Sequence, residues 1–290
     1  MRYDGHVHTA LWEGYNSAPE DNGRLLMERL AGSGLSGAAV ISVNPMAYGS
    51  WSPEKRIEDV MKTCGVSDTL FPYYFVNPLE SDAVSQVRLA AENGIAGFKM
   101  MCSEYRVDCT QSMDVVSEIA KAGKPVLFHS GICWDGMNSA NNHKPANFEA
   151  LIDIPGLKFC LAHVSWPWYD ECIAVYGKFA NAYAANHDSP EMFIDITPGT
   201  PRPYREEVLT RLIKWSEYEL RYNLIFGTDC CAFDYNSPWS DEWQKRDDAI
   251  YEKLVEDPED FKAHVYGMNL LRFIGKSEEK VERKSPLVAK

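Results

Sequence analysis

Short apolar segments rich in β-branched and aromatic residues recur along the chain, and a longer segment of helical pattern follows each of them. This alternation is typical of βα units, whose strands lie side by side in a parallel sheet. The predicted strands are residues 2–8, 37–43, 70–76, 95–101, 124–130, 157–163, 192–197 and 223–229. Eight such units close a TIM barrel, which takes about 250 residues. The sequence therefore predicts an α/β protein with a single (β/α)8 barrel.

The ends of the predicted helices carry residues that begin and stop helices. Residues 52–65 begin with Ser52 as the predicted N-cap and Pro53 at the first helical position, and they end at Gly65. Two later helical segments end at Gly94 and Gly123, where glycine readily adopts the left-handed conformation of a C-terminal cap. These signals support the division of the chain into strands and helices.

We find no linker or change in composition that would mark a second domain. We expect residues 1–275 to form the barrel, with residues 240–275 adding one or two helices that cover its outside or its foot. Residues 276–290 carry charges of both signs and are predicted to be a mobile C-terminal tail. The alternative is an open doubly wound sheet, which is disfavoured because no glycine-rich dinucleotide loop follows the first predicted strand.

Composition argues against several classes of function. The net charge of −13 and the lack of a basic stripe argue against a nucleic-acid partner. The apolar runs are too short to span a bilayer, and the first residues lack the apolar region of a signal peptide. Eight cysteines without a CxxC pattern fit reduced thiols in the cytoplasm. We expect a cytoplasmic protein that acts on a small molecule, and a homodimer, because two-fold homo-oligomers are the commonest kind.

Six polar side chains lie at the predicted carboxyl ends of strands, the end of a TIM barrel that carries the active site. Four of the seven histidines of the chain are among them. The six residues are His6, His8, Lys99, His129, His163 and Asp229. Because side chains two apart on a strand share a face, His6 and His8 are predicted to point together into the barrel mouth.

The histidine pair alone is weak support for a metal site. A lone histidine at a strand end is more often a hydrogen-bonded core residue than a ligand, and a His-x-His pattern also arises by chance. The complete set, with histidines on strands one, five and six and an aspartate on strand eight, favours a metal site. Imidazole and carboxylate groups suit Zn²⁺, which we expect here, and also Mn²⁺ or Fe²⁺.

The order His-x-His, Lys, His, His, Asp along eight βα units resembles that of the amidohydrolase superfamily of metal-dependent TIM-barrel hydrolases. Two further motifs, FGTD at 226–229 and GMNLLRFIG at 267–275, are similar to those of its amidohydrolase-2 branch. The resemblance covers residues 2–275.

This resemblance implies a role for each site residue. A single divalent ion would be bound by His6, His8, His129 and Asp229, and it would lower the pKa of its bound water toward ~7. Asp229 would also act as general base and then as general acid. His163 would be a catalytic residue that hydrogen-bonds the substrate oxygen or orients the water.

Lys99 bears on the number of ions. In two-metal relatives a lysine on strand four is carboxylated and bridges two ions, and in that case Lys99 and His163 would both be ligands. The reaction needs an uncharged amine, so the site would have to lower the lysine pKa from about 10.4. Amidohydrolase-2 proteins often keep a basic residue there without carboxylation, where it pairs with an acid or with a substrate carboxylate. We favour one ion.

Other residues near the predicted mouth are candidates for substrate binding. Arg202 and Arg205, after strand seven, would grip a substrate carboxylate, or they are solvated arginines at the start of a helix. Trp134 and Trp166, after strands five and six, would wall a pocket, or they pack under the loops. His143, on the long loop after strand five, is expected to be a surface histidine rather than part of a lid.

These features predict a metal-dependent hydrolase. Its activated water would attack an ester, lactone, amide or related carbon centre of a small substrate that carries a carboxylate in some cases. The alternative is a non-oxidative decarboxylase of an aromatic or unsaturated acid, because that chemistry also occurs in amidohydrolase-2 relatives. A barrel that has lost activity is disfavoured because the set of site residues is complete.

Overall fold

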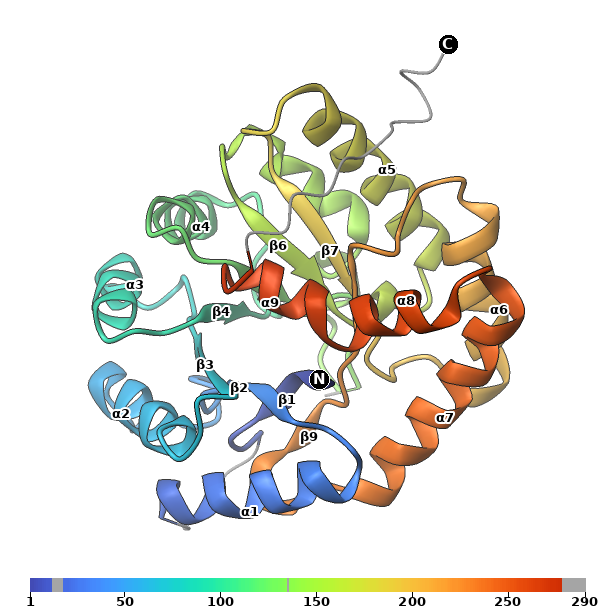
Figure 1. The fold of residues 1–290 in the computed structure, drawn as a ribbon. Coiled ribbons are helices and arrows are strands. Elements are labelled where there is room, and N and C mark those ends of the chain that lie inside the picture. The colour runs from blue at the N-terminus through green and yellow to red at the C-terminus, as the bar shows by residue number, and fades with distance from the viewer. Residues whose placement is uncertain (12–17, 135, 278–290) are drawn as a thin grey trace.

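The computed structural model describes residues 1–11, 18–134 and 136–277, and its centre is a curled sheet (Figure 1). The strands are β1 (Tyr3–His8), β2 (Gly37–Ile41), β3 (Leu70–Phe75), β4 (Gly97–Met100), β5 (Val126–Phe128), β6 (Lys158–Leu161), β7 (Glu191–Asp195), β8 (Leu224–Ile225) and β9 (Cys230–Cys231). They lie in the order β8-β7-β6-β5-β4-β3-β2-β1-β9, and all neighbours are parallel. The predicted TIM barrel is confirmed. Most of the predicted tail, from residue 278 on, lies outside the described residues.

The eighth predicted strand, residues 223–229, is not continuous. Its first part, β8, pairs with β7, whereas the two residues after Asp229 form β9 and pair with β1. Between them the Gly5 amide donates to the Phe226 carbonyl and the Asp229 amide donates to the His6 carbonyl, each over 2.8 Å. The first and last strands therefore meet and close the ring, and we call this contact the seam.

Gly227 explains why the chain can pass so close to β1 at the seam. A Cβ atom at this position would lie 2.7 Å from the Cβ of His6, closer than two such carbons approach. Two residues later, Asp229 has a φ of +62°, in the left-handed region, which ends the extended conformation. The prediction of one unbroken strand was therefore wrong because of a local bend that the apolar pattern does not reveal.

Helices cover the outside of the sheet (Figure 1). They are α1 (Pro19–Gly32), α2 (Pro53–Cys64), α3 (Ala83–Glu92), α4 (Thr110–Lys121), α5 (Tyr169–Ala185), α6 (Arg205–Thr210), α7 (Ser237–Leu254), α8 (Pro258–Ala263) and α9 (Asn269–Phe273). The Ser52 hydroxyl accepts a hydrogen bond from the Lys55 amide over 3.3 Å, so the predicted cap of α2 is confirmed. Gly94 and Gly123, with φ of +89° and +66°, follow α3 and α4 as predicted.

The connection between β5 and β6 differs from the prediction that a helix follows each strand. Its regular part is a 3₁₀ segment, Pro145–Asp153, rather than an α-helix. Pro145 begins this segment and Pro155 follows two residues after its end, so prolines restrict both sides of it. The buried side chains of Phe148 and Leu151 still cover the sheet as a helix would.

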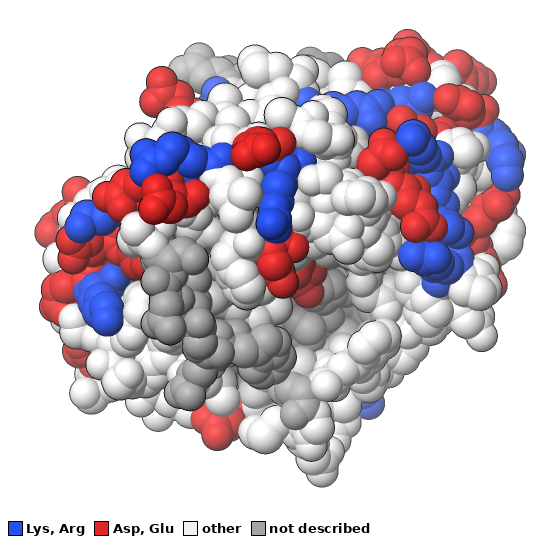
Figure 2. All heavy atoms as spheres, turned by 90° about the horizontal axis from the view of Figure 1, so that it is seen from below, with Lys and Arg blue, Asp and Glu red and all other residues white. Residues whose placement is uncertain are grey.

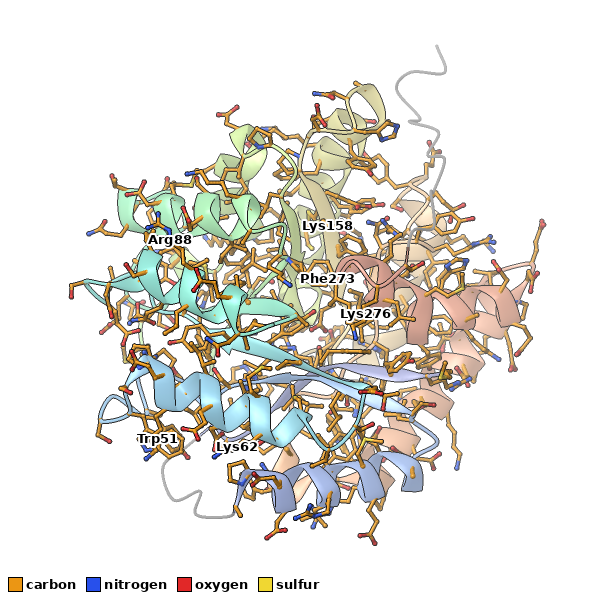
Figure 3. All side chains as sticks on the ribbon, turned by 60° about the vertical axis from the view of Figure 1, so that its left-hand side comes forward. Trp51, Lys62, Arg88, Lys158, Phe273 and Lys276 are labelled. Atoms are coloured by element: carbon orange, nitrogen blue, oxygen red, sulfur yellow. The ribbon has the colours of Figure 1, made fainter. Side chains whose placement is uncertain are left out.

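Apolar side chains form two main layers. The larger layer lies between the sheet and the surrounding helices, and a second cluster fills the inside of the barrel. Leu270 and Phe273 of α9 join this inner cluster, and the rings of Phe273 and Phe193 lie 4.9 Å apart. Figure 3 labels Phe273 at this foot of the barrel, with Lys158 and Lys276 around it. Helices do cover this end of the barrel as predicted, but α7, α8 and α9 are three where one or two were expected over residues 240–275.

Charged side chains of both signs are interspersed over the outer surface, as the space-filling view shows (Figure 2). The same view shows a hollow with acidic residues at its upper edge and uncharged residues to its right. None of the helices among the described residues is long and apolar enough to cross a membrane.

Candidate metal site

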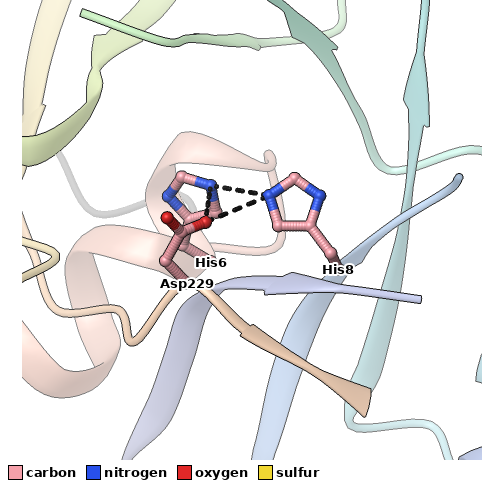
Figure 4. Close-up of side chains that lie close together, drawn as sticks. All are labelled: His6, His8 and Asp229. Carbon is pink, nitrogen blue, oxygen red and sulfur yellow. Dashed lines mark hydrogen bonds and ion pairs between the residues drawn. The ribbon is translucent and has the colours of Figure 1, made fainter. Parts of the chain in front are cut away.

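Three side chains that were predicted to bind an ion meet at the seam (Figure 4). His6 and His8 point to the same side of β1, and Asp229 approaches them from the bend between β8 and β9. The two Nε2 atoms lie 3.2 Å apart. Asp229 Oδ1 lies 3.3 Å from His6 Nε2 and 3.1 Å from His8 Nε2. Two nitrogens and one carboxylate oxygen therefore converge on one point.

A buried aspartate holds the backbone that carries these ligands. One Asp4 oxygen, Oδ1, accepts hydrogen bonds from the backbone amides of His6 and Thr228, each over 3.0 Å. The other, Oδ2, accepts from the hydroxyls of Thr228 and Tyr235 at 2.7 and 2.8 Å. Asp4 thereby fixes the residue before Asp229 against the first strand.

Protonation at the cluster suits a cation. Burial lowers the pKa of His6 well below its ordinary value and also lowers that of His8, so both rings are neutral. Burial alone would raise the pKa of the Asp229 carboxyl, but the neighbouring imidazoles hold it well below its usual range. A carboxylate and two neutral imidazoles are the donors that catalytic zinc sites use. The residues present therefore fit a divalent ion.

Asp195, at the end of β7, orients His6, a role that was not predicted from the sequence. His6 Nδ1 donates to Asp195 Oδ2 over 2.7 Å, which leaves Nε2 unprotonated and directed at the other two ligands. Burial raises the pKa of Asp195 to about 6, so this carboxyl is still ionised at neutral pH. Asp195 lies at the carboxyl end of a strand, the end of a TIM barrel that carries the active site. The rule that identified Asp229 therefore also applies to Asp195.

Lys99 of β4 lies directly beside the cluster. Its side chain is buried, and Nζ is 3.3 Å from His6 Nε2. Burial lowers the pKa of Lys99, against the opposing effect of the Asp229 and Asp195 carboxylates. The amine is therefore placed to act next to an ion.

His129 and His163 line the adjacent side of the site. The His163 ring lies 5.5 Å from the ring of His6 and 5.0 Å from that of His129, and its Nε2 is 3.9 Å from Asp229 Oδ2. Burial lowers the pKa of His163 to about 4, and it also lowers that of His129 well below its ordinary value. Among the described residues, the three-residue cluster of potential ligands includes neither of them.

His143 was expected at the surface, and this expectation was wrong. Its side chain is fully buried, and its ring lies 4.8 Å from that of His129. The backbone holds the loop in place, since the Gly131 amide donates to the His143 carbonyl over 3.1 Å. A fifth histidine therefore supports the site from the loop after β5, and its spacing in the sequence gave no signal of this.

Two of the site residues adopt an unusual backbone conformation. Asp229 and His163 have positive φ, and His163 begins a run of three such residues that includes the β-branched Val164. β-branched residues rarely adopt this conformation, and such outliers cluster at functional sites. The predicted strand 157–163 consequently ends at Leu161, two residues before His163.

The sequence model of the amidohydrolase family, in its amidohydrolase-2 branch, matches residues 4–276. The chain belongs to the amidohydrolase family. Family membership makes it an enzyme of the metal-dependent hydrolase type. No curated protein matches this amidohydrolase.

Solved structures share the fold of this amidohydrolase at low sequence identity. An amidohydrolase from Burkholderia multivorans with bound zinc is 12% identical, covers 95% of this chain and 99% of its own, and has a TM-score of 0.63. A probable 2-pyrone-4,6-dicarboxylic acid hydrolase from Acinetobacter baumannii with bound citric acid is 12% identical, with 94% and 99% covered and a TM-score of 0.61. An amidohydrolase 2 from Bifidobacterium longum subsp. infantis is 12% identical, with 95% and 99% covered and a TM-score of 0.59.

The two arginines proposed for substrate binding are engaged elsewhere in this amidohydrolase. Arg205 is fully buried between α6 and α7 and makes two hydrogen bonds with Asp247, over 2.8 and 2.6 Å. This placement argues against a role in substrate binding, because the guanidinium already holds a carboxylate in the helical layer. Arg202 is exposed and pairs with Glu242 over 3.2 Å.

The two tryptophans proposed to wall a pocket differ in their surroundings. Trp134 is 79% exposed on the loop after β5. Trp166 is half-buried, stacks on Tyr169 with ring centroids 5.7 Å apart, and lies 5.0 Å from the ring of Tyr204. Trp166 therefore combines both alternatives, since it packs under the loops and contributes to an aromatic surface.

Proposed function

We propose that this amidohydrolase is a hydrolase that uses one divalent ion, Zn²⁺ in the first place, to attack an ester, lactone or amide with water. The observation that carries the proposal is the convergence of His6 Nε2, His8 Nε2 and Asp229 Oδ1, with His6 oriented by Asp195. The zinc bound by the Burkholderia multivorans amidohydrolase supports the choice of metal.

Each site residue has a distinct role in this proposal. A bound divalent ion supplies Lewis acidity and a lowered pKa for water at the site. His6, His8 and Asp229 hold the ion, and His129 provides a further nitrogen donor. Asp229 accepts the proton of the attacking water and returns it to the leaving group. His163, neutral and 3.9 Å from Asp229 Oδ2, hydrogen-bonds the substrate oxygen.

Metal content and turnover of matched variants test the proposal. We expect about one ion per chain in the wild type and less than ~0.3 in His8→Ala, because removal of one of the three converging ligands abolishes tight binding. Asp229→Asn is expected to lose at least ~100-fold in kcat over a panel of esters and lactones, since it removes both a ligand and the base. His187→Ala, at an exposed histidine after α5, is the control and should match the wild type.

The same assays separate hydrolysis from decarboxylation. Hydrolysis releases an acid and consumes water, whereas decarboxylation of hydroxybenzoates releases carbon dioxide and consumes none. Release of carbon dioxide without acid release from any ester or lactone would replace the hydrolase proposal with the decarboxylase. A wild-type protein grown with zinc that holds less than ~0.3 ion per chain would overturn both.

A further inference from the structure

Large apolar side chains are exposed at the end of the barrel that carries the site. Most of the exposed large hydrophobic residues in the described part of the chain lie on segments that follow β2, β3, β5, β7 and β9. In a parallel barrel these segments all emerge at the carboxyl end of the strands. Six of these residues form what we call the apolar collar: Met46, Leu79, Ile132, Trp134, Tyr204 and Phe233.

The apolar collar is connected to the metal site through the loop after β6. His163 lies three residues before Trp166, whose carbonyl accepts a hydrogen bond from the Ile132 amide over 2.7 Å. The ring of Trp166 in turn lies 5.0 Å from that of Tyr204. An apolar surface therefore begins close to a site histidine and continues outward over the loops that follow β5, β6 and β7.

The arginines at this end of the barrel are paired with carboxylates of the protein. Arg106 pairs with Asp108 over 2.8 Å, Arg202 with Glu242 over 3.2 Å, and Arg205 with Asp247 over 2.6 Å. In the segments after the strands, as far as the structure describes them, every arginine thus holds a carboxylate of the protein.

We propose that the substrate carries a bulky apolar group, an aromatic ring or an acyl chain, next to the carbonyl that is attacked. This inference rests on the proposed function, because the carbonyl must lie at the cluster of His6, His8 and Asp229. The apolar group then lies on the part of the collar formed by the loops after β5 and β7, which Trp166 connects. Exposed apolar surface beside a site marks a place where a ligand binds.

Binding of hydroxamic acids to the zinc-loaded protein tests the inference without turnover. Acetohydroxamic acid reports on the metal, and octanohydroxamic acid adds six methylenes that would lie on the collar. We expect octanohydroxamic acid to bind about 50-fold more tightly by calorimetry, at roughly twofold for each half-buried methylene. The monohydroxamate of adipic acid should bind at least ~10-fold more weakly than hexanohydroxamic acid, because its far carboxylate would lose solvation without gaining a cationic partner.

Two exposed tryptophans provide a matched pair of variants. Trp134→Ser removes the most exposed aromatic ring of the collar, whereas Trp215→Ser removes a ring that is 60% exposed in the helical layer after α6. We expect Trp134→Ser to weaken octanohydroxamic acid binding at least ~5-fold and to leave acetohydroxamic acid binding within about twofold. Trp215→Ser should change neither.

The outcomes distinguish failure of this inference from failure of the proposed function. If acetohydroxamic acid binds and chain length has no effect, the inference is wrong and the proposed function stands. If no hydroxamic acid binds the zinc-loaded protein, both are wrong. A wild-type dimer that Trp134→Ser dissociates, or wild-type protein that sediments with phosphatidylcholine vesicles while Trp134→Ser does not, would assign the collar to a second copy or to a lipid surface and overturn the inference.

Discussion

His6 occupies the most constrained position of the site. Its Nδ1 is committed to Asp195 and its Nε2 faces His8, Asp229 and Lys99, so every polar atom of its ring has a defined neighbour. The ring therefore has one tautomer suited to metal binding. That tautomer depends on Asp195, which hydrogen-bonds His6 and therefore acts on the cluster through this ring.

Replacement of Asp195 by asparagine should weaken metal binding. The amide is a poorer acceptor for His6 Nδ1–H and can also turn its NH₂ group toward the ring, so the imidazole becomes less basic and less well oriented. We expect a 10- to 100-fold loss of zinc affinity, roughly the usual effect of removing such a partner, measured by competition with a chromogenic chelator. Asp188→Asn, at an exposed position before β7, is the control. Equal affinity in both variants would contradict a positioning role.

The role of Lys99 can be tested by counting the zinc ions that each chain contains. If the site holds one ion, wild-type protein and Lys99→Met will both contain about one zinc per chain, because the three-residue cluster does not include the amine. A carboxylated lysine that bridges two ions predicts two per chain in the wild type, a mass increase of about 44 Da in the intact protein, and loss of both features in Lys99→Met. We expect the first result, by elemental analysis and mass spectrometry.

At the residue scale, the sequence predicted which strand-end side chains lie together, but not which loop side chains join them. His6, His8, Lys99 and Asp229 could be identified because a parallel barrel brings the carboxyl ends of all strands together. The same rule, applied to the end of the seventh strand, would have found Asp195. His143 could not be identified, because its burial depends on how a long loop folds back over His129, and no periodicity encodes that path.

Helix α2 contains an acid that its position does not favour. Asp59 is buried in the helical layer, and one of its oxygens, Oδ2, has no hydrogen-bond partner among the described residues. Burial raises its pKa from 3.8 to about 6, despite the opposing effect of nearby Lys55, while Glu20 and Glu58 raise it further. The folded-state pKa lies above the unfolded value, so ionisation of Asp59 destabilises the fold.

Asp59→Asn should therefore stabilise the protein in a pH-dependent way. The gain should be absent below pH 3.8, grow up to about pH 6 and stay constant above that value. At pH 8 we expect about 1–2 kcal/mol in the free energy of unfolding by urea denaturation. Asp114→Asn, on the exposed face of α4, should change it by less than about 0.5 kcal/mol at any pH. A gain of the same size at pH 4 and pH 8 would rule out this explanation.

At the element scale, helix ends were predicted better than strand ends. Ser52, Gly94 and Gly123 have local signatures, because capping depends on a few neighbouring residues. The division of the eighth strand depends instead on how close Gly227 comes to His6 across the ring, which is a tertiary contact. The segment after β5 has prolines on both sides and forms a 3₁₀ helix. Its apolar pattern is that of an α-helix, so the effect of the prolines was not predicted.

The two ends of the barrel have different roles: the foot contributes to stability, and the opposite end carries the candidate metal site. Helix α9 closes the foot, where Arg272 pairs with the buried Glu191 and Phe273 fills the inner cluster. The metal cluster and the apolar collar lie at the opposite end. Stability and binding should therefore respond to different substitutions.

Phe273→Ala tests this separation. Loss of a buried phenylalanine ring should reduce the free energy of unfolding by about 3–5 kcal/mol. Zinc affinity of the folded protein should stay within about twofold of the wild type, because the ligands lie on the far rim. Met268→Ala, at a partly exposed methionine just before α9, should change stability by less than about 0.5 kcal/mol. A parallel loss of zinc affinity would show that the two ends are coupled.

The position of His6, His8 and Asp229 at the seam links ion binding to closure of the barrel. His6 and His8 belong to the first strand of the ring, and Asp229 belongs to the bend in the last one. An ion held by all three would therefore link the two strands that meet at the seam. Opening of the barrel at that join would have to release the ion first. A bound ion would then stabilise the closed barrel and the catalytic site together. We expect the Gly5 and Asp229 amides to exchange hydrogen more slowly when zinc is present.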